Sequence, residues 1–173
     1  VVFGLADVHS WGPKMAMFMK IDGVDGTATQ EKHKKWIYIE SLSWGVARAM
    51  SVTTGGTFNR EGSEPQLTEV VVTKSTDGSS PKLFQLGCGL DPIGKPVKID
   101  FVRTSSPGDT YMTYTLHNVI ISSYSLSAAG DAPSESLTLN FTKFDMKYTP
   151  LDEKLKPTQP INVSYDMSTT KTE

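Results

Sequence analysis

The residues of this chain that could do chemistry are three histidines, one cysteine and scattered carboxylates, and their spacing forms no recognisable site. His33 lies in the charged run Glu-Lys-His-Lys-Lys, which favours a solvated turn. His117 lies in the middle of an expected strand and is interpreted as a hydrogen-bonded structural residue. His9 falls in an irregular N-terminal stretch. Cys88 has no Cys or His at ligand spacing, which argues against zinc and favours a small buried thiol.

The motifs of enzymes that use an activated serine or a bound phosphate are missing from the sequence. No nucleophile elbow G-x-S-x-G occurs. Gly94 and Lys95 are followed by proline, without the glycine-rich approach and the Ser/Thr of a phosphate-binding loop. Asp100, Asp109 and Asp131 are expected to be turn or surface carboxylates without partners. The sequence therefore predicts no catalytic residues, no metal and no cofactor, and a protein that acts through its surfaces.

Composition narrows the class of protein further. The chain has 173 residues, of which 38% are hydrophobic and 21% charged, and this is typical of one soluble globular domain. The net charge of −2 comes without a basic block, so nucleic acid is a poor partner. No apolar run reaches the roughly 20 residues of a membrane helix, so no direct membrane insertion is expected. A single cysteine excludes a disulfide scaffold and favours folding in a reducing cytoplasm.

The stretch 116–148 indicates an all-β fold. Apolar side chains alternate from Leu137 to Phe141 and again from Phe144 to Tyr148, which is the period of a half-buried strand. The phase slips by one residue between the two runs. A slip sends later side chains to the opposite face unless a bulge absorbs the extra residue. The sequence therefore predicts a long, bent strand of the kind that closes a barrel.

The remaining elements are further strands and one short helix. Ser80 can cap a helix, Pro81 suits its first turn, and the helix is expected to run to about Leu86. It should pack on the sheets through Leu83, Phe84 or Leu86. Other strands are expected at 17–21, 36–48, 66–74, 96–103, 110–126 and 161–167.

The chain is interpreted as one domain with two irregular ends. Residues 1–14 lack an initiator Met and a convincing cleavage site, and are expected to be tag or upstream sequence, not a cleavable signal peptide. Residues 15–167 are expected to form the single domain, and 168–173 a frayed tail.

The segment 49–65 is rich in glycine and polar residues and has no periodicity. It is interpreted either as a functional extension of the domain or as a surface loop without a partner.

Four stretches together resemble the Hcp family, the hemolysin-coregulated proteins that build the inner tube of bacterial type VI secretion systems. The combination of W-I-x-x-x-S-x-S-W-G, T-K-x-x-D-x-S-S-P-K-L and H-N-V-I-I-S-S-Y carries the resemblance. The matching stretches, in the family's order, are 17–26, 31–45, 70–89 and 116–150. Residues 1–14 and the segment after Pro150 depart from the pattern.

The resemblance implies a two-sheet β-barrel with an α-helix on its flank and an extended loop, and no enzymatic activity. It implies self-assembly into hexameric rings that stack into a tube, with a spike protein, a sheath and effector proteins as partners. It also implies synthesis in the bacterial cytoplasm and release from the cell. In that setting the segment 49–65 is the expected stacking arm, with candidate assembly residues Thr53, Gly55, Gly56, Phe58, Asn59 and Arg60.

Two alternatives share part of this pattern. A phage-type tail-tube protein would have the same fold and would also assemble into rings. Only genomic context separates it from a type VI protein. A monomeric β-sandwich that binds carbohydrate would instead need an exposed aromatic platform.

Overall fold

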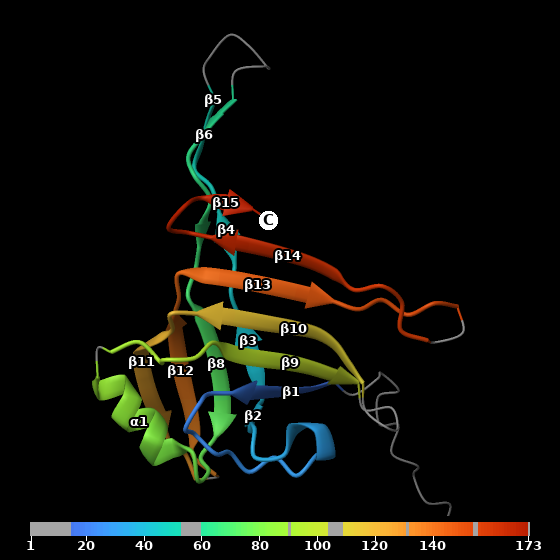
Figure 1. Ribbon diagram of the computed structural model, residues 1–173. Helices are drawn as coiled ribbons and strands as arrows, with labels where there is room; N and C mark the ends of the chain where they lie inside the picture. The colour runs from blue at the N-terminus through green and yellow to red at the C-terminus, as the bar shows by residue number, and fades with distance from the viewer. Residues whose placement is uncertain are drawn as a thin grey trace, which may run out of the picture.

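The computed structural model describes residues 15–52, 60–89, 91–103, 109–130, 132–153 and 156–172. The expected all-β class with one short helix is confirmed, and the strands form two main antiparallel sheets (Figure 1). The larger sheet has seven strands, in the spatial order β15 (Lys171–Thr172), β14 (Ile161–Asp166), β13 (Lys143–Tyr148), β10 (Thr110–His117), β9 (Val97–Arg103), β1 (Met15–Lys20) and β2 (Ile37–Ile39). The smaller sheet has four, in the order β11 (Ile120–Ser127), β12 (Ser134–Asn140), β8 (Val70–Ser75) and β3 (Ser41–Ser43).

The core lies between these two sheets and is built from the alternate residues of their strands. Met19 of β1 and Ile99 of β9 face it from the larger sheet, and Val72 of β8 and Leu137 of β12 from the smaller one; all four are fully buried. In the described residues no ladder joins the two sheets. The two-sheet part of the expected architecture is thus present, whereas a closed barrel is not detected.

The chain changes from one sheet to the other where long strands were expected to continue. The expected strand 110–126 is interrupted at Asn118, whose φ of +53° lies in the left-handed region that asparagine tolerates better than most residues. The stretch 134–148 is interrupted at 141–142. The Asn118 side-chain amide donates to the Thr142 hydroxyl at 2.8 Å, which ties the two crossing points together. The phase slip after Phe141 therefore marks a change of sheet and not a bend within one strand.

The expected strand 36–48 is also divided between sheets. Its first part is β2 in the larger sheet, its second part is β3 in the smaller sheet, and its last part is β4 (Val46–Ala47), which pairs with β7 (Gln66–Leu67). The expected strand 66–74 correspondingly divides into β7 and β8. The expected strands at 17–21, 96–103 and 161–167 appear as β1, β9 and β14 with shifts of one or two residues.

Helix α1 (Ser80–Cys88) packs on the smaller sheet, beside β11. Ser79 takes the cap position, one residue before the expected Ser80, and Pro81 lies in the first turn. Leu83 is fully buried, as expected of one candidate contact. Phe84, another of the three candidates, does not pack into the protein: its side chain is 57% exposed, and its ring contact among the described residues is with Tyr124, at 5.8 Å between centroids.

The two ends differ in what the structure describes. Residues 1–14, interpreted as tag or upstream sequence, lie outside the described residues. The tail 168–173, expected to fray, contains β15, whose Lys171 and Thr172 pair with Asp166 and Tyr165 of β14. Within the described part of the chain, no helix has the length and hydropathy needed to span a bilayer.

Candidate assembly surface

The structure gives His33 a different environment from the expected solvated turn. Its side chain is 2% exposed, and it lies in the short 3-10 helix η1 (Glu31–His33). One ring nitrogen, Nε2, is 2.8 Å from Asp100 Oδ2, and the other, Nδ1, is 2.7 Å from Gln30 Oε1. Asp100 was expected to have no partner, and so was Asp109, which pairs with Lys32 at 3.3 Å. Both expectations are wrong, because the partners are about 70 residues away in the sequence.

His117 is the hydrogen-bonded strand histidine that the sequence predicted. Its Nε2 lies 2.7 Å from Asp145 Oδ2, and Ser164 donates its hydroxyl to Asp145 Oδ1 at 2.5 Å. The carboxylate stands between the histidine and the serine, so the imidazole does not contact the hydroxyl that it would have to deprotonate. Partial burial raises the pKa of Asp145, but the bonds from Ser164 and His117 outweigh it and hold that pKa below its usual value. This arrangement braces β10, β13 and β14.

A buried ion cluster beneath the start of α1 was missed by sequence reasoning. The Lys74 ammonium, 1% exposed, lies 3.0 Å from Glu135 Oε2 and 2.9 Å from Asp77 Oδ1, and donates to the Ser75 carbonyl at 2.7 Å. Glu135 is fully buried and its other oxygen, Oε1, has no hydrogen-bond partner. The cluster joins β8, β12 and the turn that begins α1. Its contacts connect these three elements in the interior of the protein.

A sequence signal for this cluster did exist. Lys74 follows Val70 and Val72 at period two, and Glu135 precedes Leu137 and Leu139 at period two, so both charges occupy inward positions of their strands. A lysine and a glutamate on inward positions of adjacent strands indicate a buried pair, because neither would be buried alone.

The remaining candidates for a reactive site are Cys88 and possible metal ligands. Cys88 is exposed at the end of α1, so the expectation of a buried thiol is wrong. In the described ranges, no group of three or more His, Cys, Asp or Glu side chains could hold a metal ion.

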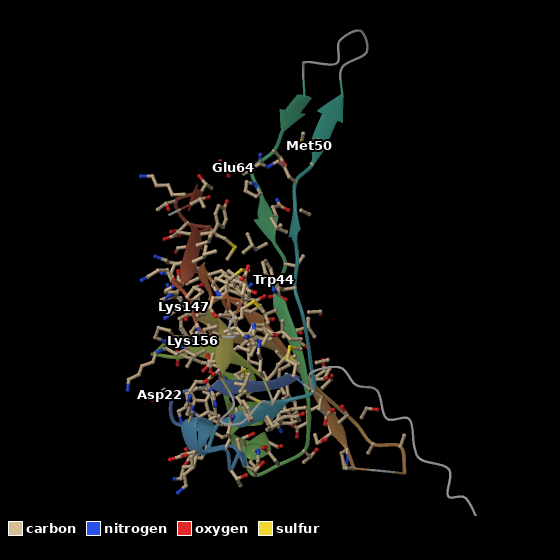
Figure 2. The ribbon with its side chains drawn as sticks, turned by 90° about the vertical axis from the view of Figure 1, so that its right-hand side faces the viewer. Asp22, Trp44, Met50, Glu64, Lys147 and Lys156 are labelled. Carbon is tan, nitrogen blue, oxygen red and sulfur yellow. The ribbon has the colours of Figure 1, made fainter. Side chains whose placement is uncertain are left out.

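The most distinctive feature of the structure is a two-stranded arm, whose described part consists of residues 46–52 and 60–67. It begins where β4 pairs with β7 and continues into β5 (Met50–Val52) paired with β6 (Arg60–Gly62). Figures 1 and 2 show it projecting from the end of the two sheets, with Met50 and Glu64 already beyond the body. The described parts of the irregular segment 49–65 therefore contain a pair of strands. Thr53, Gly55, Gly56, Phe58 and Asn59 lie outside the described residues, and Arg60 begins β6.

An apolar groove of about 270 Å³ lies between the base of the arm and the outer strands of the larger sheet. Here the seven-stranded sheet extends past the four-stranded one, and the thin β4–β7 ribbon lies beside β14 (Figure 1). Val163 is 48% exposed and Val46 61% exposed. The groove is lined by Trp44, Val46, Pro65, Leu67, Phe144, Met146, Val163, Tyr165 and Thr172.

This end of the molecule is apolar beyond the groove as well. Ile161 of β14 is 59% exposed, and Tyr148, its partner on β13, is 38% exposed. Tyr111 contacts the Tyr148 ring edge-on at 6.4 Å and reaches the Met15 sulfur with its hydroxyl. Neighbouring exposed apolar side chains across several strands are typical of a surface that another protein covers. The arm and this surface together are typical of the class of protein that binds other protein chains.

Comparison with known proteins places the chain in a family. The profile of the family described as "Type VI secretion system effector, Hcp" matches residues 18–148, which include the four-stranded sheet, the helix and the larger sheet except for β14, β15 and the start of β1. The chain belongs to the Hcp family, and it is a type VI secretion tube or effector protein. Proteins of this family are exported by type VI secretion systems. No match was found among curated protein sequences.

Solved structures show the same fold. One described as a type six secretion system protein superposes with a TM-score of 0.84 at 23% identity, covering 92% of this chain and 100% of that one. Hcp1 from Salmonella typhimurium gives 0.74 at 23% identity, covering 92% and 99%. A type VI secretion system effector from Yersinia pestis gives 0.63 at 24% identity, covering 87% and 98%.

Proposed function

We propose that this chain is the tube subunit of a type VI secretion system. Six copies close into a ring, rings stack into a tube, and a sheath propels the tube with its spike while effectors occupy the channel. The protein is made in the bacterial cytoplasm and ends outside the producing cell. The family match over residues 18–148 carries the proposal.

The shape of the molecule supports assembly. A ring needs a heterologous interface, in which one patch of each subunit meets a different patch of the next. The described strands of the arm, β5 and β6, reach past the sheets of their own chain (Figure 2), so they are available to another subunit. The apolar face of β14 is half-covered in the isolated chain, and a second copy of this chain is the partner that a ring supplies. We expect each interface to bury more than about 1,000 Å² in total.

The test is the mass of the protein in solution by light scattering, followed by electron microscopy. The expected mass is six times the 18.9 kDa of one chain, with ring-shaped particles. A monomer at every concentration, with no rings in the images, would refute the proposal.

Replacing Val163 with aspartate should convert the rings to monomers. The substitution places a charge on the half-exposed apolar face of β14, where burial by a second copy would leave it without a partner. Asn162→Asp is the matched control, because it adds the same charge at the next position of the strand, on the opposite face of the sheet. Light scattering of both variants checks the prediction, and equal effects of the two would contradict it.

Deleting 53–59 should leave the fold intact and weaken the stacking of rings. The ladders of the two main sheets lie elsewhere, and β5 and β6, which flank the deleted residues, pair with each other. Far-UV circular dichroism and electron microscopy at high protein concentration provide the two measurements. A deletion that unfolds the chain but preserves stacked rings would show that the arm supports the body instead.

A further inference from the structure

A second exposed apolar surface lies where α1 rests on β11. Phe84 is 57% exposed, and Cys88, which follows it by four residues and so lies on the same side of the helix, is exposed as well. Leu126 of β11 is 52% exposed. Tyr124 precedes it by two residues on the same face of the strand and meets the Phe84 ring edge-on at 5.8 Å. These four side chains, none of them charged, are called the helix patch below.

The helix patch and the apolar groove lie at opposite ends of the molecule. Figure 1 shows α1 at the lower end and the strands that border the groove, β4, β14 and β15, at the upper end. The two surfaces of one chain therefore do not meet. The lining of the groove is also free of charged side chains. Depletion of charge at the centre is what distinguishes a protein–protein interface from the rest of a surface.

The shapes of the two surfaces are complementary. The groove is a hollow of about 270 Å³, and its wall is fixed by the core, because the Trp44 ring lies 4.5 Å from the Phe144 ring and 5.9 Å from the Tyr114 ring between centroids. Phe84 instead stands on the outside of α1. An aromatic side chain that fills a pocket of its partner is a common centre of a protein–protein contact.

A second copy of this chain is the partner that covers both surfaces. In a heterologous contact one patch of each subunit meets a different patch of the next, so every copy fills one groove and inserts one helix patch. An unrelated protein seated in the groove would leave the helix patch exposed on each subunit. The presence of a hollow and a projecting apolar surface on the same chain therefore favours self-association.

We infer that the groove of one subunit receives the helix patch of a second copy, with Phe84 seated between the base of the arm and β14. The inference rests on the proposed function, because it states which two surfaces meet when subunits assemble. Val46 and Val163 of the groove, 61% and 48% exposed, are then covered together with Phe84 and Leu126. Removal of this apolar area from water stabilises the contact.

A disulfide between two chains tests the contact in the full-length protein. Cys88 of the helix patch is the single cysteine of the sequence, and Val46→Cys places a second thiol at the groove. The two thiols of one chain lie at opposite ends of it (Figure 1), so a bond between them joins two chains. After oxidation catalysed by copper phenanthroline, non-reducing electrophoresis should show a ladder of two, three and more chains. A ladder that ends at six chains places the contact within the ring, and a longer ladder places it between stacked rings.

Two control variants give the ladder its meaning. Tyr38→Cys places the second thiol on β2, at a 46% exposed position outside both surfaces, and should give dimers at most. Val46→Cys combined with Cys88→Ser retains only the groove thiol and should also stop at dimers. Rings in electron micrographs without a ladder from Val46→Cys, or an equal ladder from Tyr38→Cys, would refute the contact and leave the ring in place. A wild-type protein that forms no rings would refute the proposed function, and this contact with it.

Replacing Phe84 with aspartate tests the contact without a crosslink. The substitution brings a charge without a partner into the apolar groove of the next subunit. The protein concentration at which the assembly dissociates, measured by light scattering, should rise by more than about tenfold. Gln85→Asp is the matched control, because it adds the same charge at the next exposed position, about 100° further round the helix. Far-UV circular dichroism shows that both variants fold, and a folded Phe84→Asp variant that assembles as well as Gln85→Asp would overturn the inference.

Discussion

Replacing Lys74 with alanine should lower the free energy of unfolding by about 3–5 kcal/mol, because it leaves a buried carboxylate without its counter-ion. The Glu135 side chain is fully buried, and Lys74 is the cation that contacts it. The removed ammonium also holds Asp77 at the start of α1, so the turn before the helix loses a contact as well. Urea unfolding followed by tryptophan fluorescence measures the change.

Two control variants distinguish the effect of leaving a buried charge unpaired from the effect of removing a lysine charge. Lys95→Ala removes an exposed pair with Asp22, whose side chains are 71% and 54% exposed, and should cost less than about 1 kcal/mol. The double variant Lys74→Met with Glu135→Leu removes both buried charges and should recover most of the lost stability, because an apolar pair of similar size avoids the desolvation penalty. A Lys74→Ala effect no larger than that of Lys95→Ala would contradict the role of the cluster.

The same cluster predicts how stability depends on acid. Burial raises the pKa of Glu135 and of Asp77, but hydrogen bonds from Ser80 and Ser79, together with Lys74, outweigh burial and hold both pKa values below their usual range. A carboxyl group whose pKa is lowered on folding contributes stability above its unfolded pKa, and this contribution is lost as pH falls through the folded value. The wild type should therefore lose stability below about pH 4, and the double variant should lose less.

Replacing Leu83 with alanine should destabilise the protein by about 2–5 kcal/mol, because it opens a cavity where α1 meets the core. Leu83 is fully buried and belongs to the main core cluster. It is the side chain of α1 that enters the core completely, so the loss should also detach the helix from β11. Chemical unfolding provides the magnitude, and amide exchange within α1 shows where the loss occurs.

Phe84→Ala is the matched control for this prediction. Phe84 is the next residue of the same helix, but it is 57% exposed and contacts only the edge of Tyr124. Its loss should cost about 1 kcal/mol or less, the size of an aromatic edge contact. If Phe84→Ala lowers the free energy of unfolding as much as Leu83→Ala does, the helix packs through the face that carries Phe84, and the prediction is wrong.

Local patterns were enough for the class of fold and for the helix. Alternation from Leu137 to Leu139 and the Ser80-Pro81 start depend on neighbours within a few residues, so the sequence alone carries them. The sequence did not determine which face of the helix packs on the sheet. Leu83 and Phe84 are adjacent, and only the position of α1 on β11 decides which of them is buried.

The meaning of the phase slip could not be read from the sequence. The extra residue between Phe141 and Phe144 is visible, but a bulge and a change of sheet produce the same pattern. Pairing partners separate the two: β12 pairs with β8, whereas β13 pairs with β10 and β14. The same holds for the segment 49–65, where the short strands of the arm have too few residues to show a period.

The sequence by itself determined that this chain is a β protein of the Hcp type with one helix, because alternation and family motifs are properties of the chain. It could also have indicated the buried pair of Lys74 and Glu135, since each occupies an inward position of its own strand. Only the tertiary structure decided that His33 is buried against Asp100, and that β14 leaves an apolar face open beside the arm. Those contacts join residues that are far apart in the chain, and the energy of burial depends on what packs around a side chain and not on its immediate neighbours in sequence.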